Sequence, residues 1–273
     1  MAGGASRSGD ERRVRSRGYL PALTVFEASA HGDGRVAVEI PVSRDEGLSV
    51  LIPRTLLGTA QVPQGSELRL FSRGDDFIIA LDRNELMSSR MSGSEEALAV
   101  MSCERLPRGD TPHLLIGGYG MGFTLRAALA ELGPKARISV AELVPEIIDW
   151  ARGPMAAMTA GCLDDPRVEL VMDDVARVIG AATGRYDAIL LDVDNGPDGL
   201  TRAANNRIYS MAGLATARRA LRPGGILAIW SAAADPQFTR RLESAGFAVD
   251  PVAVRARSNG KGAKHMIWFA RSR

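Results

Sequence analysis

The chain has 273 residues, of which 45% are hydrophobic and 24% are charged, and its formal net charge is +2. Such a chain can form one sizeable α/β domain with a smaller domain beside it, and its small charge predicts no general attraction to nucleic acid or to membranes. No apolar run has the length of a membrane span. The two cysteines, Cys103 and Cys162, and three scattered histidines predict neither a disulfide framework nor a metal site, so we expect a cytoplasmic protein without a metal.

The first seventeen residues carry five arginines and almost no apolar residue. A segment of this composition cannot bury a core, which predicts a disordered basic tail over residues 1–18. It also lacks the apolar stretch of a secretory signal. A solvated tail is favoured here over an arm that binds nucleic acid.

Residues 19–90 contain short segments of β-forming residues between glycines, prolines and aspartates, namely GRVAVEIPV, LSVLIP, SELRLFSRG and DDFIIALDRN. These segments predict a small β-rich N-terminal domain of antiparallel hairpins. At the junction with the next domain, Glu85 and Arg90 are candidates to line a binding pocket. The nearby Met87 and Met91 are expected to be packing residues.

The second domain is expected over residues 91–273, and its first segment, SGSEEALAVMSCERL, predicts a helix. Ser92 or Ser94 can cap this helix, and Glu95 and Glu96 fall in its first turn, where the helix dipole favours acidic side chains.

Strand and helix patterns alternate in the rest of this domain. Strands are expected at 113–118, 137–143, 167–174, 186–194 and 226–233, and helices at 123–133, 145–158, 175–183, 211–222 and 235–246. Pro223-Gly224-Gly225 is expected to end the fourth of these helices. The apolar segments 247–257 and 265–272 predict a terminal antiparallel hairpin. The pattern therefore predicts an α/β, Rossmann-like fold with a mainly parallel seven-stranded sheet.

Ligands of such sheets bind beyond the carboxyl ends of the strands. A glycine-rich turn follows the first strand and consists of Gly117, Gly118, Tyr119, Gly120, Met121 and Gly122. Glu142 ends the next strand 20 residues later, and Asp173 and Asp174 end the third strand. A glycine turn followed at this distance by an acid is typical of nucleoside binding, because the carboxylate can accept both ribose hydroxyls.

Each of these features has a structural alternative. The glycines could serve tight packing of helix on sheet, Glu142 could be a solvated strand end, and Asp174 could either contact an adenine amino group or cap the following helix. A nicotinamide-binding fold is a rival interpretation. The spacing GGxGxG differs from the GxGxxG of that fold, and the terminal antiparallel hairpin is typical of class I S-adenosylmethionine-dependent transferases.

Four segments, LLIGGYGMGFTLRAAL, VAELVPEIIDWAR, DDPRVELVMDDV and YDAILLDVDNGP, resemble the spermidine synthase family. That family has an IGGGDGG turn and VEIDPEV, DPRV and YDVIIxDSSDP segments. The similarity extends through NNRIYSMAGLATARRALRPGGILAIW and covers about residues 112–230. The resemblance implies an N-terminal β-domain, an S-adenosylmethionine-type cofactor, a small-molecule acceptor and commonly a homodimer.

The same resemblance implies roles for single residues. Glu142 corresponds to the acid that binds ribose, Asp174 to the acid on the adenine side, and Asp192 to the catalytic aspartate at the end of the fourth strand. Tyr209 corresponds to the tyrosine of the family's LYS segment and, like Glu85 and Arg90, is a candidate to contact the acceptor.

Three departures from the family pattern each remove part of a site built for cationic polyamines. Gly120 stands where the family has the acid of GGGDG, which in aminopropyltransferases helps to hold the free amine of decarboxylated S-adenosylmethionine. The second acid of DSSDP is replaced by Asn195, with Asp194 one place earlier. The glutamine expected after the family's LDG segment is replaced within LDRNELM.

A carboxylate attracts a bare ammonium and repels the carboxylate of an intact amino acid. Loss of the acid at Gly120 therefore favours methyl transfer from S-adenosylmethionine to a small amine-type acceptor. Aminopropyl transfer from decarboxylated S-adenosylmethionine to putrescine is the alternative, because another acid could supply the charge. A non-catalytic module that binds an adenosyl ligand is a second alternative.

In either reaction Asp192 is expected to orient the acceptor and to receive its proton. Asp194, Asn195 and Asp198 lie in the same loop and could add to the acceptor site, whereas the structural alternative is that Asp192 caps the turn.

A basic loop follows the sixth strand and contains Arg255, Arg257, Lys261 and Lys264. It is interpreted either as a solvated loop or as a site for an anionic part of the acceptor. Together with the basic tail it motivates a weaker alternative, modification of nucleic acid, so nucleic acid is the less favoured partner.

Overall fold

The computed structural model describes residues 53–63, 67–82, 84–106, 109, 111–193 and 207–273. The chain divides into residues 1–49 and a compact unit that runs from Val50 to Arg273, and the account below concerns that unit. The expected basic tail, the expected strand at 34–42, Asp194, Asn195 and Asp198 lie outside the described residues, as does the expected strand at 48–53 apart from Pro53.

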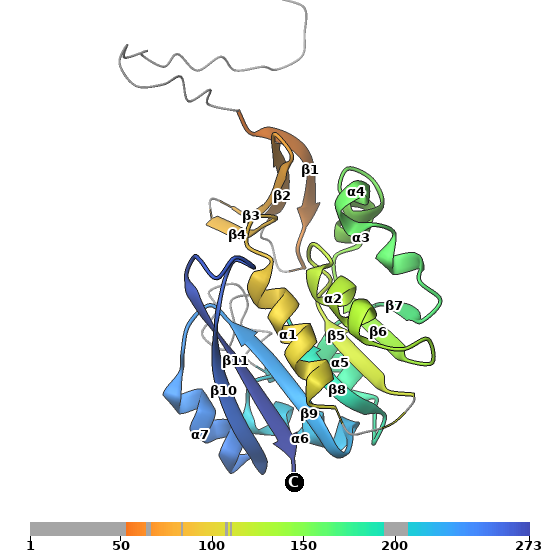
Figure 1. Cartoon of the computed structure of the whole chain (residues 1–273), viewed down its shortest axis with the longest axis vertical. Coiled ribbons are helices and arrows are strands. Elements are labelled where there is room, and N and C mark those ends of the chain that lie inside the picture. Colours follow the sequence, from red (N-terminus) through yellow and green to blue (C-terminus); the bar gives the residue numbers. More distant parts are fainter. Residues whose placement is uncertain (1–52, 64–66, 83, 107–108, 110, 194–206) are drawn as a thin grey trace, which may run out of the picture. The chain divides into compact units, whose positions relative to one another are not determined.

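The described part begins with a small antiparallel sheet in the order β1-β2-β3-β4 (Figure 1). Its strands are β1 (Thr55–Gln61), β2 (Glu67–Arg73), β3 (Asp76–Leu81) and β4 (Asn84–Ser88). Leu68 and Leu70 alternate with more exposed residues along β2, which is the period-two pattern that predicts a half-buried strand. β2 and β3 agree with the expected segments.

The sequence did not predict β1 and β4. β1 lacks a regular alternation, and Leu56 and Leu57 both remain exposed in it. β4 follows a tight turn in which Asp82 has a φ of 53°, a left-handed conformation that aspartate tolerates better than most residues. Because neither glycine nor proline marks this turn, the segment was interpreted as a domain junction.

The main sheet has seven strands in the order β10-β11-β9-β8-β5-β6-β7. The strands are β5 (His113–Gly117), β6 (Arg137–Glu142), β7 (Val168–Met172), β8 (Tyr186–Leu191), β9 (Leu221–Ser231), β10 (Phe247–Arg255) and β11 (Lys264–Ser272). β11 is antiparallel to both β9 and β10, whereas the pairs from β9 to β7 are parallel. The expected Rossmann-like sheet with a terminal antiparallel hairpin is confirmed.

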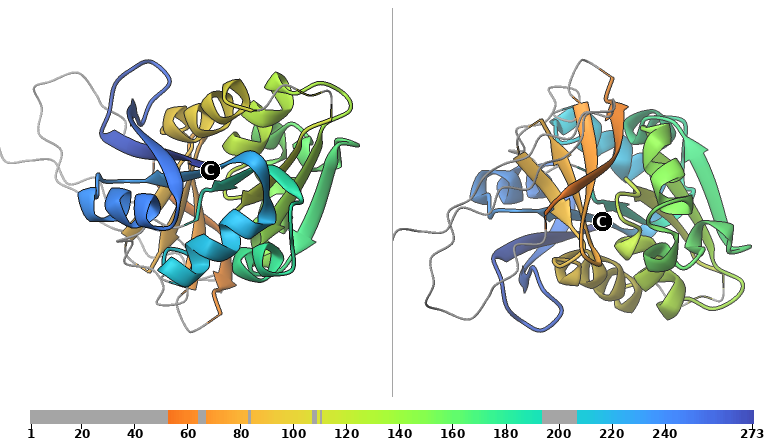
Figure 2. Two further views of the ribbon diagram at one scale, coloured as in Figure 1. Left: turned by 90° about the horizontal axis from the view of Figure 1, so that it is seen from below. Right: turned by 90° about the horizontal axis from the view of Figure 1, so that it is seen from above.

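Helices cover both faces of this sheet (Figure 2). One face carries α1 (Gly93–Glu104), α2 (Phe123–Glu131) and α3 (Pro145–Arg152), and the other carries α5 (Val175–Gly180), α6 (Met211–Ala220) and α7 (Pro236–Ser244). The central strands lie between two apolar cores, which explains why residues 188–191 of β8 form an uninterrupted buried apolar run.

Three expectations about these helices were wrong. The helix expected at 145–158 is interrupted after α3, and a short helix α4 (Ala156–Thr159) follows Pro154, whose ring cannot continue the first helix. α6 ends at Ala220, and residues 223–225 belong to an extension of β9. Neither Ser92 nor Ser94 caps α1 through its side chain.

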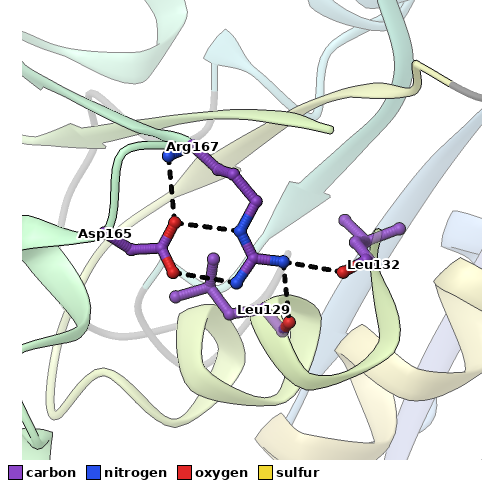
Figure 3. Close-up of polar contacts among 4 residues, drawn as sticks. All are labelled: Leu129, Leu132, Asp165 and Arg167. Atoms are coloured by element: carbon purple, nitrogen blue, oxygen red, sulfur yellow. Dashed lines mark hydrogen bonds and ion pairs between the residues drawn. The ribbon is translucent and has the colours of Figure 1, made fainter. Parts of the chain in front are cut away.

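Asp165 and Arg167 form an ion pair just before β7, and Arg167 also hydrogen-bonds to the end of α2 (Figure 3). The Arg167 guanidinium donates to Asp165 through Nε at 2.9 Å and Nη2 at 2.8 Å, and its Nη1 donates to the carbonyls of Leu129 and Leu132 at 3.0 and 2.6 Å. Hydrogen bonding to Arg167 lowers the pKa of Asp165 to about 2. We call Asp165 and Arg167 the clamp; it satisfies two carbonyls where α2 ends.

Candidate active site

The glycine turn connects β5 to α2 at the carboxyl edge of the sheet, where the sequence predicts a ligand site. Gly118, Gly120 and Gly122 have φ values of 86°, 54° and 76°, in the left-handed region that favours glycine. A Cβ at Gly118 would lie 2.5 Å from the Asp192 carbonyl oxygen, and one at Gly117 would lie 2.7 Å from Val175 Cγ2. Tight packing of helix on sheet therefore requires glycine at both positions, whether or not the turn binds a ligand.

Glu142 ends β6 next to this turn and is 8% exposed. Its Oε2 accepts the backbone N–H of Tyr119 at 2.9 Å, and its Oε1 accepts those of Leu143 and Val144 at 2.7 and 2.9 Å. The carboxylate is therefore held by the backbone on both sides and is not a solvated strand end. Oε2 accepts one of these hydrogen bonds, so it retains capacity for a ligand hydroxyl.

The Tyr119 side chain lies buried beneath the turn, and contact of this residue with the cofactor stays a prediction. It is 4% exposed, and its hydroxyl lies 3.4 Å from Cys162 Sγ. Burial raises the pKa of this phenol. Tyr119 thus serves the turn through its backbone N–H, while its ring anchors the turn to the core.

Asp173 and Asp174 follow β7, and their contacts differ. Asp174 caps α5, since its Oδ1 accepts the N–H of Ala176 at 2.8 Å. Asp173 accepts the N–H of Asp174 at 2.8 Å and lies 3.5 Å from the Arg177 guanidinium. The capping alternative for Asp174 is what the structure shows, and the adenine contact stays a prediction for both acids.

Asp192 follows β8 and lies against the glycine turn. Its backbone N–H donates to the Gly117 carbonyl at 3.0 Å, and its Oδ2 accepts the Thr124 hydroxyl at 2.7 Å. Burial raises the pKa of Asp192 to about 6, although the hydrogen bond from Thr124 opposes this rise. The carboxylate is thus largely ionised at neutral pH and lies where a reacting amine could meet it.

The structure adds an acid that the sequence analysis did not place in the site. Glu95 in the first turn of α1 has its pKa raised to about 8, first by burial and then by the negative charge of Asp192. The Thr124 hydroxyl connects the two segments, because it lies 3.4 Å from the Glu95 carbonyl oxygen as well as against Asp192. From the sequence, Glu95 is expected only to interact with the dipole of α1, a role that any exposed first-turn acid could fill.

Two further residues position Glu95. The Ser94 hydroxyl donates to Glu95 Oε2 at 2.6 Å and lies 2.9 Å from His265 Nδ1. Ser94 is fully buried, and burial lowers the pKa of His265, which favours the neutral imidazole. Residues from α1, α2, β8 and β11 therefore meet at one place.

Met87 of β4 faces the turn at Gly120. A Cβ built at Gly120 would lie 3.1 Å from both Sδ and Cε of Met87. A side chain at residue 120 would therefore begin next to the apolar thioether of Met87, which belongs to the small sheet. This position agrees with the packing role expected for Met87.

In the part of the chain that the structure describes, the other residues predicted to bind the acceptor contact residues outside this cluster. Glu85 pairs with Arg54 at 3.3 Å, and Arg90 pairs with Asp76. Tyr209 is 2% exposed and packs edge-on against Phe238 in the second core. Contacts of these residues with an acceptor stay predictions.

The basic loop lies close to the site. β10 runs parallel to β9, and the N–H of Gly93 at the start of α1 donates to the Ala256 carbonyl at 2.9 Å. A Cβ at Gly93 would collide with the backbone of Arg257. The loop therefore lies beside the first turn of α1, as expected for a strand parallel to the sheet, and binding of an anion there stays a prediction.

Within the described ranges, no three His, Cys, Asp or Glu side chains gather as metal ligands would. Likewise, no helix in that part of the chain is long and apolar enough to cross a membrane.

Comparisons with solved structures support the fold. A spermidine synthase from Thermotoga maritima superposes with a TM-score of 0.64 at 20% identity, over 80% of this chain and 73% of that one. A spermidine synthase in complex with the transition-state analogue AdoDATO gives a TM-score of 0.63 at 19% identity, over 80% and 72%. At these identities the likeness shows the fold alone.

Sequence comparisons reach closer relatives. A polyamine aminopropyltransferase of Mycobacterium tuberculosis is 32% identical over 199 residues, which cover 69% of this chain but 36% of the relative. A polyamine aminopropyltransferase of Nitrosomonas europaea is 32% identical over 124 residues, 45% of this chain and 36% of the relative. The chain thus matches about a third of the length of these relatives. The spermine/spermidine synthase domain matches residues 95–242, more than half of the chain, and the protein belongs to that family.

Proposed function

We propose that the protein transfers an aminopropyl group from decarboxylated S-adenosylmethionine to a small amine such as putrescine. Its relatives are named for this activity, and Asp192 is a carboxylate held at the strand end beside the glycine turn. The position of Asp192 is the observation that carries the proposal. The comparisons favour this reaction, which the sequence analysis treated as the alternative, over methyl transfer.

The residues around the turn fit an adenosyl group. Glu142 keeps acceptor capacity at Oε2 for a ribose hydroxyl, as its single hydrogen bond there leaves a lone pair. Met172 ends β7, the strand that pairs with β6, and it is 47% exposed. It offers apolar surface next to Asp173. The sulfonium donor would supply an activated carbon and a thioether that leaves readily.

The protein's own part in the reaction is to orient the amine and remove a proton from it. A primary amine carries a proton at neutral pH, so it must lose that proton before its nitrogen lone pair can attack carbon. Asp192, with its pKa of about 6, binds the ammonium and accepts the proton. The new carbon–nitrogen bond forms as the carbon–sulfur bond breaks, and the electrons of that bond remain on sulfur.

The proposal is tested with purified protein, decarboxylated S-adenosylmethionine and putrescine. Release of methylthioadenosine with formation of spermidine is expected, and both should fall sharply in Asp192→Asn. Binding of the donor without any product, for every diamine tried, would support the non-catalytic alternative instead.

Methyl transfer from S-adenosylmethionine remains the second candidate because the turn carries no acid at Gly120, where Met87 lies. An intact carboxylate would meet no repulsion from residue 120. Release of S-adenosylhomocysteine, with tighter binding of S-adenosylmethionine than of its decarboxylated form, would favour this reaction over aminopropyl transfer.

We also propose that the protein forms a homodimer. Leu56 and Leu57 on the outer strand β1 are 51% and 39% exposed, and a second copy could bury them. Light scattering of the whole chain should give twice the mass of 29.1 kDa, and a mass of one chain would contradict the proposal.

A further inference from the structure

Two carboxylates lie together at the candidate site without a cation between them. The Thr124 hydroxyl donates to Asp192 Oδ2 at 2.7 Å and lies 3.4 Å from the Glu95 carbonyl oxygen, and the charge of Asp192 raises the pKa of Glu95. In the part of the chain that the structure describes, neither carboxylate forms an ion pair with lysine, arginine or histidine. Buried carboxylates are ordinarily paired, so this arrangement suits a positive group that comes from outside the chain.

Glu95 is held in place by buried groups. When Glu95 is ionised, the Ser94 hydroxyl donates its only hydrogen to Oε2, so His265 Nδ1 must be the donor to Ser94. Ser94 is 0% exposed, and the His265 ring packs edge-on against Trp230 with centroids 4.8 Å apart. This packing holds the His265 ring in place, and through Ser94 it fixes the orientation of the Glu95 side chain.

Among the described residues, the other acids near the turn already have partners. Glu142 is engaged by three backbone N–H groups, and Asp174 caps α5. Residue 120 is a glycine bordered by Met87. A cationic substrate that reaches the turn would therefore find its negative charge at Asp192 and Glu95, among the described residues.

We propose that Glu95 is a specificity-determining residue which, together with Asp192, binds the ammonium group of an amine substrate. This inference rests on the proposed function, because it assigns the charge that an aminopropyl transfer needs. Ser94 is a positioning residue that acts through Glu95. One negative charge would be shared by the pair at neutral pH, and a second would develop as the solution becomes more alkaline.

The groups that face Glu95 determine this titration. Asp192 and, more weakly, Glu96 raise its pKa, Ser94 lowers it by hydrogen bonding, and His265 beyond Ser94 is favoured in its neutral form. Cation binding should therefore strengthen between pH 6.5 and 8.5, a range in which putrescine keeps most of its charge.

The decisive variant is Glu95→Gln, which keeps the shape of the side chain and removes its charge. The KM for putrescine is expected to rise at least tenfold and to lose its decrease between pH 6.5 and 8.5, with a smaller change in kcat. The matched control is Glu96→Gln on the same helix, for which the KM should stay within about twofold. Ser94→Ala should raise the KM by an intermediate factor, since Glu95 keeps its charge and loses its orientation.

A ligand-free measurement protects the test against a folding defect. Carbon-13 NMR of protein labelled at the side-chain carboxyls should show one glutamate titrating near pH 8 that is absent from Glu95→Gln. The Asp192 resonance should titrate at nearly the same pH in that variant, because Glu95 is still protonated and neutral at the pH where Asp192 ionises.

The outcomes separate this inference from the proposed function. An active protein whose putrescine KM is unchanged by Glu95→Gln, or a Glu95 carboxyl with an ordinary titration, would overturn the role of Glu95 and leave the reaction standing. If no product forms but calorimetry shows that Glu95→Gln weakens putrescine binding, the reaction is wrong and the ammonium site stands. Absence of both turnover and diamine binding would overturn both.

Discussion

Two acidic sites in this molecule carry the same functional group and have opposite electrostatics. In the clamp, Asp165 faces the Arg167 guanidinium, and its pKa falls to about 2. At the candidate site, burial raises the pKa of Asp192 to about 6, and burial together with the charge of Asp192 raises the pKa of Glu95 to about 8. The clamp already holds its cation, whereas the carboxylate pair holds none among the described residues.

This difference teaches how to separate structural from functional acids. An acid with a fixed partner gains its stabilisation in the folded protein and has no need of a ligand. Two acids placed together destabilise the fold until something positive arrives, and such an arrangement is common where substrates bind. The direction of the pKa shift, with its cause, therefore distinguishes the two sites more clearly than their sequence does.

The largest effect is expected from Asp192→Asn. Removing the base should lower kcat/KM for aminopropyl transfer by roughly 10²- to 10⁴-fold, measured by methylthioadenosine release. The melting temperature should stay the same or rise, because a buried charge is lost. Unchanged turnover would show that Asp192 only caps its turn.

Breaking the clamp should act on stability instead of chemistry. Arg167→Ala leaves two α2 carbonyls and the Asp165 carboxylate without their donor, at a cost of about 2 kcal/mol in unfolding free energy by urea denaturation. The control is Arg152→Ala, which removes an exposed ion pair with Asp164 at 3.3 Å and should cost roughly 0–0.5 kcal/mol. Equal losses in the two variants would contradict the structural role of the clamp.

The two sites should also give opposite limbs in the pH dependence of stability. Asp165 has a lowered folded pKa, so its contribution is present above its unfolded value near 4 and is lost as the pH falls through about 2. Asp192 and Glu95 have raised folded pKa values, so stability declines as the pH rises through about 6 and 8. Thermal melts from pH 2 to 9 should show Asp165→Asn flattening the acid limb and Glu95→Gln the alkaline limb.

The smallest effect is expected from Gly120→Asp, which adds a third carboxylate near the pair. Aspartate tolerates the φ of 54° at a cost of roughly 1 kcal/mol, and the flexible Met87 side chain must move by a few tenths of an ångström. Calorimetry should show the preference for decarboxylated over intact S-adenosylmethionine rising by severalfold. Gly120→Asn, which has the same shape without the charge, should leave the preference unchanged.

The sequence predicted the main sheet well because its signals are local and strong. The apolar run of β8, the glycine turn and the terminal hairpin each indicate their own structure. Glu142 and Asp192 could be placed at strand ends from the same alternation. The broken helix at Pro154 shows how an apolar pattern can continue across a residue that ends the helix.

Glu95 could not be recognised because its role depends on contacts distant in sequence. Asp192 lies 97 residues later in the sequence than Glu95. His265, which contacts Ser94, lies 171 residues after that serine. The same holds for the clamp, where Arg167 reaches carbonyls 35 and 38 residues earlier. A first-turn glutamate looks the same in a sequence whether it faces solvent or another acid.

The contact between Met87 and Gly120 means that the two sheets cannot be treated as separate modules. The small sheet supplies one wall of the turn on which the large sheet would bind its ligand. A shortened protein that starts at α1 would retain Glu95, Glu142 and Asp192 and still lack that wall. The expected boundary between the two domains therefore passes through the candidate site, between Met87 and Gly120.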